Sequence, residues 1–212
     1  MYQRSNMGSS NEKVNQFTNF LFEKSFGYVK GDIPEELIER AFISTLEDVR
    51  YHFPDISNNE IIDRVISNSN ELIIFLYRLG NIIYKQNLNS KLLSHVSFIM
   101  KQCCSCEIYF SNSIGKGFYP VHCVGTVVGS RNTIGDGFKI YQCCTIGHTE
   151  EENFGAVIGD NFTLYAGSKV LGDVNIGNNV TVGSHSLVLF DMHDNTKCLG
   201  IQKKAVKVDK YL

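Results

Sequence analysis

Two different spacings of hydrophobic residues divide this chain at about residue 103. In the first part, apolar residues recur every three or four positions, the spacing of a helix with one buried face. From about residue 108 a spacing of six takes over and continues to Val188. The change of period predicts a helical half, residues 1–103, followed by a repetitive β-structure.

Helices can be placed in the first half from their start signals and apolar faces. One is expected over 32–53, because Asp32 offers an N-cap and a proline stands in the first turn. Ser57 and Glu60 have the spacing of a capping box before a second helix. A third helix, over 71–85, has a broad apolar face and should be buried on several sides. We interpret this half as a bundle that packs and oligomerises, rather than as a catalytic domain.

In the second half, every sixth position from residue 128 is aliphatic with one exception. The series reads Val128, Ile134, Ile140, Ile146, Glu152, Ile158, Leu164, Val170, Ile176, Val182 and Val188. Such hexapeptide repeats form a parallel β-helix, in which three short strands make one triangular coil and the aliphatic residues stack inside. The predicted fold is therefore α+β: a helical domain at 1–103, a β-helix at 104–190, and a tail at 191–212 that covers the last coil.

The period of six is disturbed at two places. Fourteen positions separate Ile114 from Val128, two more than two repeats require, and His122 lies between them. A side chain at such a register break can point out of the coil, which makes His122 a candidate for chemistry. The segment 150–153 reads Glu-Glu-Glu-Asn and is expected to be a loop that leaves the coil.

Composition and charge exclude several other functions. The chain has 212 residues and a net charge of −2, so there is no electrostatic case for nucleic acid or a membrane surface as a partner. The start of the chain lacks the apolar stretch of a signal peptide, and the longest apolar run, 72–76, is too short to span a bilayer. We expect a cytoplasmic protein with reduced cysteines. The pair Cys103 and Cys106 has no second pair at a zinc-site distance, so we expect no metal.

Several motifs of the chain are similar to those of the serine O-acetyltransferases and related hexapeptide acyltransferases. They are Tyr77-Arg78-Leu79-Gly80, Glu107-Ile108, Ile114-Gly115-Lys116-Gly117, His122-x-x-Gly125-x-Val127-Val128-Gly129, Thr145-Ile146-Gly147, Ala166-Gly167-Ser168-Lys169-Val170-Leu171-Gly172 and Gly200-Ile201. The block that begins at His122 is specific, whereas the repeats alone indicate only the fold. The resemblance implies a left-handed β-helix, acetyl-CoA as co-substrate, and a homotrimer or dimer of trimers with active sites between subunits.

The resemblance also implies catalytic roles. His122 matches the general base, which takes the proton of the acceptor hydroxyl as that oxygen attacks the thioester. Glu107 matches the acidic partner that holds the imidazole in one tautomer and stabilises its protonated form. His148, at the root of the expected loop, is the second candidate for the base, or for a contact with the acceptor or CoA.

Small residues at coil corners would let CoA approach the backbone. The positions that match the family are Gly147, Ala166 and Ser184, where the pantetheine arm would lie against backbone amides. Lys203 and Lys204 would meet the CoA phosphates near the C-terminus.

The departures from the family concern the acceptor. Val121 stands where the family has a carboxylate, the segment 150–155 lacks the family's arginine, and no Asp-Pro-Ala segment is found in the helical half. An amino-acid acceptor is a zwitterion and needs both a cation and an anion from the protein. We therefore expect an O-acetyltransferase acting on a saccharide hydroxyl of a surface polysaccharide, capsular or lipopolysaccharide-type. The alternatives are a serine O-acetyltransferase of cysteine biosynthesis and a non-catalytic hexapeptide scaffold protein.

Overall fold

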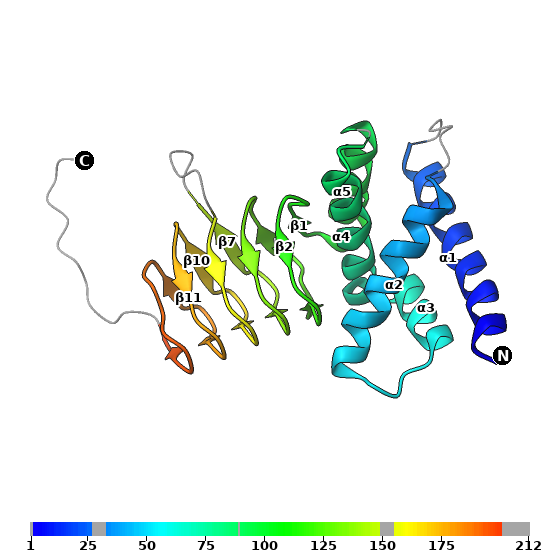
Figure 1. Cartoon of the computed structure of the whole chain (residues 1–212). Coiled ribbons are helices and arrows are strands. Elements are labelled where there is room, and N and C mark those ends of the chain that lie inside the picture. The colour runs from blue at the N-terminus through cyan, green and yellow to red at the C-terminus, as the bar shows by residue number, and fades with distance from the viewer. Residues whose placement is uncertain (1, 27–32, 89, 149–154, 201–212) are drawn as a thin grey trace, which may run out of the picture.

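A computed structural model describes residues 2–26, 33–88, 90–148 and 155–200 of the chain. Within these ranges five helices come first: α1 (Tyr2–Phe26), α2 (Glu35–His52), α3 (Asn58–Ser67), α4 (Ser69–Lys85) and α5 (Ser90–Cys104). Short strands follow: β1 (Glu107–Ile108), β2 (Ser113–Ile114), β3 (Tyr119–Pro120), β4 (Val127–Val128), β5 (Thr133–Ile134), β6 (Lys139–Ile140), β7 (Thr145–Gly147), β8 (Val157–Ile158), β9 (Thr163–Leu164), β10 (Lys169–Leu171), β11 (Asn175–Ile176), β12 (Thr181–Val182), β13 (Leu187–Val188) and β14 (Lys197–Cys198). The helices pack at one end of a column of stacked coils (Figure 1). The expected class, α+β with helices followed by a parallel β-helix, is confirmed.

Each coil of the β-helix contributes one strand to each of three parallel sheets. Sheet A has the order β1-β4-β7-β10-β13, sheet B the order β11-β8-β5-β2, and sheet C the order β14-β12-β9-β6-β3. Four complete coils are followed by β13, a bridge between Ile176 and Met192, and β14. The strand β14 pairs with β12 and lies in the segment 191–212, so part of the expected tail continues the coils. The division into domains at 103 and 190 stays an interpretation.

The interior of the β-helix is filled by stacked side chains. All ten aliphatic members of the six-residue series are buried, as the repeat predicts. A second ladder, which the period of six does not reveal, consists of Phe118, Phe138 and Phe162. Their rings stack with centroid distances of 5.6 and 5.8 Å. Burial of each aromatic ring contributes several times the free energy of a methylene group, so this ladder is a large part of the core.

Polar side chains stack along the corner between sheets B and C. The carboxylate of Asp136 accepts a hydrogen bond of 2.8 Å from the backbone N–H of Lys116, and Asp160 accepts one from Asp136 in the same way. The coils there approach so closely that a Cβ at Gly135 would lie 2.2 Å from Oδ1 of Asp160. This contact explains why glycine follows the inward aliphatic residue at this corner.

The helical half agrees in outline with the sequence analysis and differs at one cap. Ser57 caps α3, because its hydroxyl accepts a 3.2 Å hydrogen bond from the N–H of Glu60. By contrast, α2 begins at Glu35 with Pro34 in the N-cap position and no side-chain cap. Asp32, the expected cap, lies outside the described residues. No helix in the described ranges is long and apolar enough to cross a membrane.

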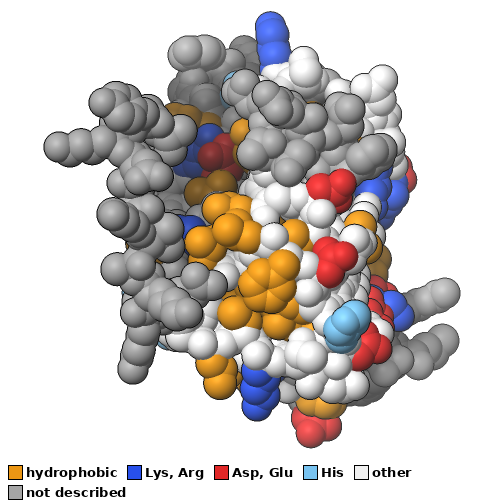
Figure 2. Space-filling view, turned by 90° about the vertical axis from the view of Figure 1, so that its left-hand side faces the viewer, with side chains coloured by type: hydrophobic (Ala, Val, Ile, Leu, Met, Phe, Trp, Pro, Cys, Tyr) orange, Lys and Arg blue, Asp and Glu red, His pale blue; other side chains and the backbone are white. Residues whose placement is uncertain are grey.

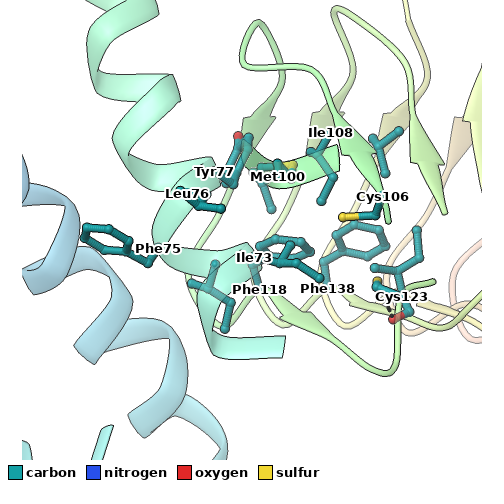
Figure 3. Packing of buried hydrophobic residues seen from close by; sticks show 14 of the residues in the cluster. Ile73, Phe75, Leu76, Tyr77, Met100, Cys106, Ile108, Phe118, Cys123 and Phe138 are labelled. Carbon is teal, nitrogen blue, oxygen red and sulfur yellow. Dashed lines mark hydrogen bonds between the residues drawn. The ribbon is translucent and has the colours of Figure 1, made fainter. Parts of the chain in front are cut away.

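The helix α4 covers the open end of the first coil. The hydroxyl of Tyr77 donates to the carbonyl of Asn112 at 2.9 Å, and the amide of Asn81 donates to the carbonyl of Phe110 at 2.7 Å. Gly80 lets the helix approach, since a Cβ there would lie 2.3 Å from the Phe110 ring. Figure 3 shows Tyr77 and Leu76 on the helix at the end of the coils, and the rings of Phe118 and Phe138 following one another inside the β-helix. The helical half and the β-helix therefore share one continuous core.

Candidate active site

The two extra residues at the register break are His122 and Cys123. In later coils the turn from sheet C to sheet A has the same length each time. Its N–H groups bond to the coil before: that of Cys143 to the carbonyl of Val124, and that of Gly167 to the carbonyl of Gln142. These bonds place Val124 level with Gln142, while Val121 is level with Tyr141. Residues 122 and 123 therefore have no equivalent in the next coil.

The inserted pair has an uncommon backbone conformation that turns the two side chains in opposite directions. His122 has a φ of +61° and Cys123 a φ of +28°, in the left-handed region that disfavours residues with a Cβ by roughly 1–2 kcal/mol each. Cys123 is fully buried, whereas His122 is exposed. Burial raises the pKa of the Cys123 thiol to about 12, so this thiol stays protonated. The insertion thus fixes one side chain in the core and presents the other to solvent.

The imidazole of His122 is not engaged within the described part of the chain. Its backbone N–H donates to Oδ1 of Asn70 at 3.0 Å, but no hydrogen bond joins its ring to the described residues. Such a ring remains available to a substrate hydroxyl or to a group from another subunit. This placement agrees with the role of general base that the sequence analysis gives to His122, and that role stays a prediction.

Glu107 forms no hydrogen bond or ion pair with His122 within the described residues. Its carboxylate forms an ion pair of 2.6 Å with the ammonium group of Lys101 in α5. Both side chains line a cavity of about 460 Å³ between α5 and the start of sheet A. The role of Glu107 as the acidic partner of His122 therefore stays a prediction, which would need a rearrangement or a second subunit.

Gly147 and His148 lie where strand β7 of sheet A ends, at the corner opposite to that of His122. The strands of sheet A are parallel: β4 begins after the corner that carries His122, and β7 ends at the corner that carries His148. Nε2 of His148 is 3.2 Å from both the hydroxyl and the carbonyl oxygen of Ser130. Within one chain, the two candidate bases therefore lie at opposite ends of the strands of sheet A. The expected loop that follows, 149–154, lies outside the described residues.

Ala166 and Ser184 share the corner of His122. They continue a column of corner residues that begins with Val124 and Gln142. The N–H of the residue that follows each of the later column members bonds to the carbonyl of the column member in the coil before. The backbone N–H groups of Ala166 and Ser184 form no hydrogen bond with the residues described here. Two small residues whose backbone N–H groups are open, in successive coils of one corner, fit an extended amide-containing ligand such as pantetheine. Lys203 and Lys204 lie outside the described residues.

A charged pair that no sequence motif indicated lies beside this corner. Glu71 follows Asn70, the residue that contacts His122, and its carboxylate is buried with a side-chain exposure of 1%. The guanidinium of Arg64, on α3, is half-buried and lies 3.5 Å from it. Burial raises the pKa of Tyr119 in β3; the charge of Glu71 raises it further, and that of Arg64 opposes the rise. A buried carboxylate in an apolar helix is a signal that sequence reasoning can use.

Three comparisons place the chain among known proteins. A family model described as "Bacterial transferase hexapeptide (six repeats)" matches residues 155–189. A serine acetyltransferase of Staphylococcus aureus (strain Mu50) is 40% identical over 105 residues, 49% of this chain and 49% of that protein. One of Staphylococcus epidermidis (strain ATCC 12228) is 41% identical over 103 residues, 48% of each. The chain thus spans about half the length of the curated relatives it matches.

Solved structures show the same fold over most of the chain. The serine acetyltransferase of Neisseria gonorrhoeae in complex with serine has a TM-score of 0.71 at 18% identity, covering 91% of this chain and 83% of that one. Soybean serine acetyltransferase has a TM-score of 0.66 at 25% identity, covering 81% and 69%. A serine acetyltransferase in complex with CoA has a TM-score of 0.64 at 22% identity, covering 80% and 69%.

Proposed function

We propose that this chain, a serine O-acetyltransferase-like hexapeptide-repeat protein, transfers an acetyl group from acetyl-CoA to the hydroxyl of serine. The observation that carries the proposal is the 40% identity to curated serine acetyltransferases over 105 residues. The geometry adds support, because the insertion at the first corner exposes His122 beside the column of Ala166 and Ser184. These are the parts that a transfer from a thioester to an alcohol requires: a base and a surface for the donor.

The expectation of a sugar acceptor on a surface or capsular polysaccharide was wrong. The curated relatives described above are serine acetyltransferases, and so are the proteins with similar structures. The expectation rested on Val121, on the missing arginine in the segment 150–155, and on the absence of an Asp-Pro-Ala segment from the helical half. That reasoning failed because the charges a zwitterion needs do not have to come from one loop.

In the proposed reaction, His122 moves one proton. The neutral imidazole accepts the proton of the serine hydroxyl as the hydroxyl oxygen bonds to the thioester carbonyl carbon. As the bond between this carbon and sulfur breaks, the imidazolium returns the proton to the sulfur. O-acetylserine and the free thiol of CoA result, and His122 is again neutral.

The donor would lie along the corner column of the β-helix. Backbone N–H groups of Ala166 and Ser184 can donate to the amide carbonyls of pantetheine, and small side chains permit that approach. Gly147 and His148 lie at the opposite end of the sheet A strands. They can take part only if another subunit brings its own Gly147 and His148 to this corner. We therefore place the complete site between subunits, as the resemblance implies.

A thiol-release assay tests the proposal. The purified chain is mixed with acetyl-CoA and either L-serine or L-alanine, which has the same charges but no hydroxyl. We expect release of CoA thiol with serine alone, with kcat/KM on the order of 10⁴ M⁻¹s⁻¹ or higher, and O-acetylserine detected by mass spectrometry. Release that is absent, or equal with both amino acids, would contradict the proposal and favour a non-catalytic scaffold.

A further inference from the structure

The first coil of a β-helix lacks a preceding coil to bind its corner. In later coils, the corner N–H groups of Cys143, Gly167 and His185 each bond to a carbonyl of the coil before. The corner of the first coil is also the longest, since it contains the inserted His122 and Cys123. The N–H of Gly125 finds its partner in Ser105, just after α5. The N–H of His122 needs an acceptor from elsewhere.

The helical half supplies that acceptor through Asn70. Asn70 is in the first turn of α4, and its Oδ1 accepts the hydrogen bond from the N–H of His122 at 3.0 Å. The residue is itself oriented at the helix start, because its own N–H donates to Oδ1 of Asn68, the N-cap, at 3.0 Å. Farther along the same helix, Arg78 and Tyr77 fix α4 to the first coil. The acceptor is thus carried by a rigid element and not by a loop.

We propose that Asn70 is a positioning residue for His122, which rests on the function proposed above. The left-handed backbone of His122 directs its ring outward, and that conformation is intrinsically unfavourable. The hydrogen bond that the His122 N–H donates to Oδ1 of Asn70 selects this conformation. Without this bond the two inserted residues can relax, and the imidazole moves away from the line of attack. A shift of about 1 Å in a reacting group is enough to lower turnover by up to ~10²-fold.

Substitutions at Asn70 separate positioning from simple stability. Asn70→Ala removes the acceptor, whereas Asn70→Asp keeps an acceptor oxygen at the same place. We expect Asn70→Ala to lower kcat by roughly tenfold or more with KM for acetyl-CoA unchanged, and Asn70→Asp to restore most of kcat. Ser57→Ala is the control: it removes a helix-start hydrogen bond in α3, lowers the melting temperature, and leaves kcat unchanged. Equal kcat in Asn70→Ala and the wild type would overturn the proposal, and so would failure of Asn70→Asp to restore it.

Amide hydrogen exchange provides a readout that does not depend on activity. Exchange measured by mass spectrometry over the peptide that contains His122 should be faster in Asn70→Ala than in the wild type, and should be slow again in Asn70→Asp. If the wild type shows no acetyl transfer, the function proposed above fails while this exchange pattern still tests the Asn70 contact. Unchanged exchange in Asn70→Ala would show that Asn70 does not hold the corner.

Discussion

Arg78 of α4 holds the buried carboxylate of Asp48 of α2 in a two-point ion pair. Its Nε lies 2.7 Å from Oδ2, and its Nη2 lies 2.8 Å from Oδ1. The same guanidinium donates to the carbonyls of Ile114 and Gly115 in the first coil, at 2.8 and 2.6 Å. Asp48 also accepts from the backbone N–H of Phe118. Two helices and the first coil therefore meet at one buried charge pair.

Removal of Arg78 should destabilise the chain strongly. Arg78→Met leaves the Asp48 carboxylate buried without its partner and two carbonyls without a donor. We expect the free energy of unfolding to fall by about 3–5 kcal/mol, measured by urea denaturation. Arg40→Met is the matched control, because Arg40 forms an exposed pair of 3.9 Å with Glu36. A loss for Arg78→Met no larger than that of the control would contradict the role of the pair.

His52 should make stability depend on pH. Its Nε2 lies 2.9 Å from the carbonyl oxygen of Gly117. Burial lowers the pKa of the imidazole and the nearby Lys139 lowers it further, whereas the hydrogen bond to Gly117 and the charge of Asp48 oppose this shift. In the unfolded chain the His52 imidazole binds a proton near pH 6.5, whereas in the folded chain it binds a proton only at lower pH. The stability contribution is complete above about pH 6.5 and is lost as the pH falls below that value.

The matched variant for this effect is His52→Gln, which can still donate to Gly117 but does not titrate. Melting temperatures measured from pH 7.5 to pH 5 should fall less steeply for His52→Gln than for the wild type. Parallel curves would show that another group is responsible for the pH dependence.

His122→Asn should abolish most of the proposed activity. Asparagine cannot take the hydroxyl proton, so we expect kcat to fall by at least ~10²-fold, with the dissociation constant of CoA unchanged in calorimetry. His193→Asn, at an exposed position of the last coil, is the control and should keep full activity. Near-normal turnover of a folded His122→Asn protein, with a large loss in His148→Asn, would transfer the role of base to His148.

A larger side chain at Ala166 should obstruct the donor. Ala166→Leu covers the backbone N–H groups of the corner column, so we expect the KM for acetyl-CoA to rise roughly tenfold, equivalent to about 1.4 kcal/mol of lost binding. The KM for serine should not change. Thr133→Leu, an exposed change of the same kind on sheet B, is the control. Equal acetyl-CoA KM values for the two variants would place the donor elsewhere.

The chain should assemble as a trimer or as a dimer of trimers. Exposed apolar side chains occur along sheet A and its corners, including Val127, Leu187, Leu189 and Phe190. Figure 2 shows hydrophobic side chains gathered on the end of the molecule that carries the last coils. A three-fold interface between columns that lie side by side would cover the exposed apolar residues of sheet A and bring the corner that carries His148 toward the His122 corner of the next subunit. Light scattering should give a multiple of three chains, and an active monomer at micromolar concentration would contradict this prediction.

The sequence by itself determines the β-helix and the position of the exposed histidine. A repeat of six fixes which residue of each unit points inward, because every coil stacks on a copy of itself and no distant contact is needed. The same arithmetic shows two extra residues before Val128, and the structure identifies them as His122 and Cys123. The capping signal at Ser57 is equally local, since donor and acceptor are three residues apart.

Only the tertiary structure decides what surrounds that histidine. The contact of Asn70 with His122, the hydrogen bonds of Arg78 to the carbonyls of Ile114 and Gly115, and the pairing of Lys101 with Glu107 all join the helical half to the first coil. They depend on how α4 and α5 dock onto that coil, and no period or spacing encodes a docking angle. Gly147 likewise matches a motif, but it lies at the opposite end of the sheet A strands from Ala166. Repeats specify local geometry, whereas contacts between dissimilar halves are set by the packing of the whole core.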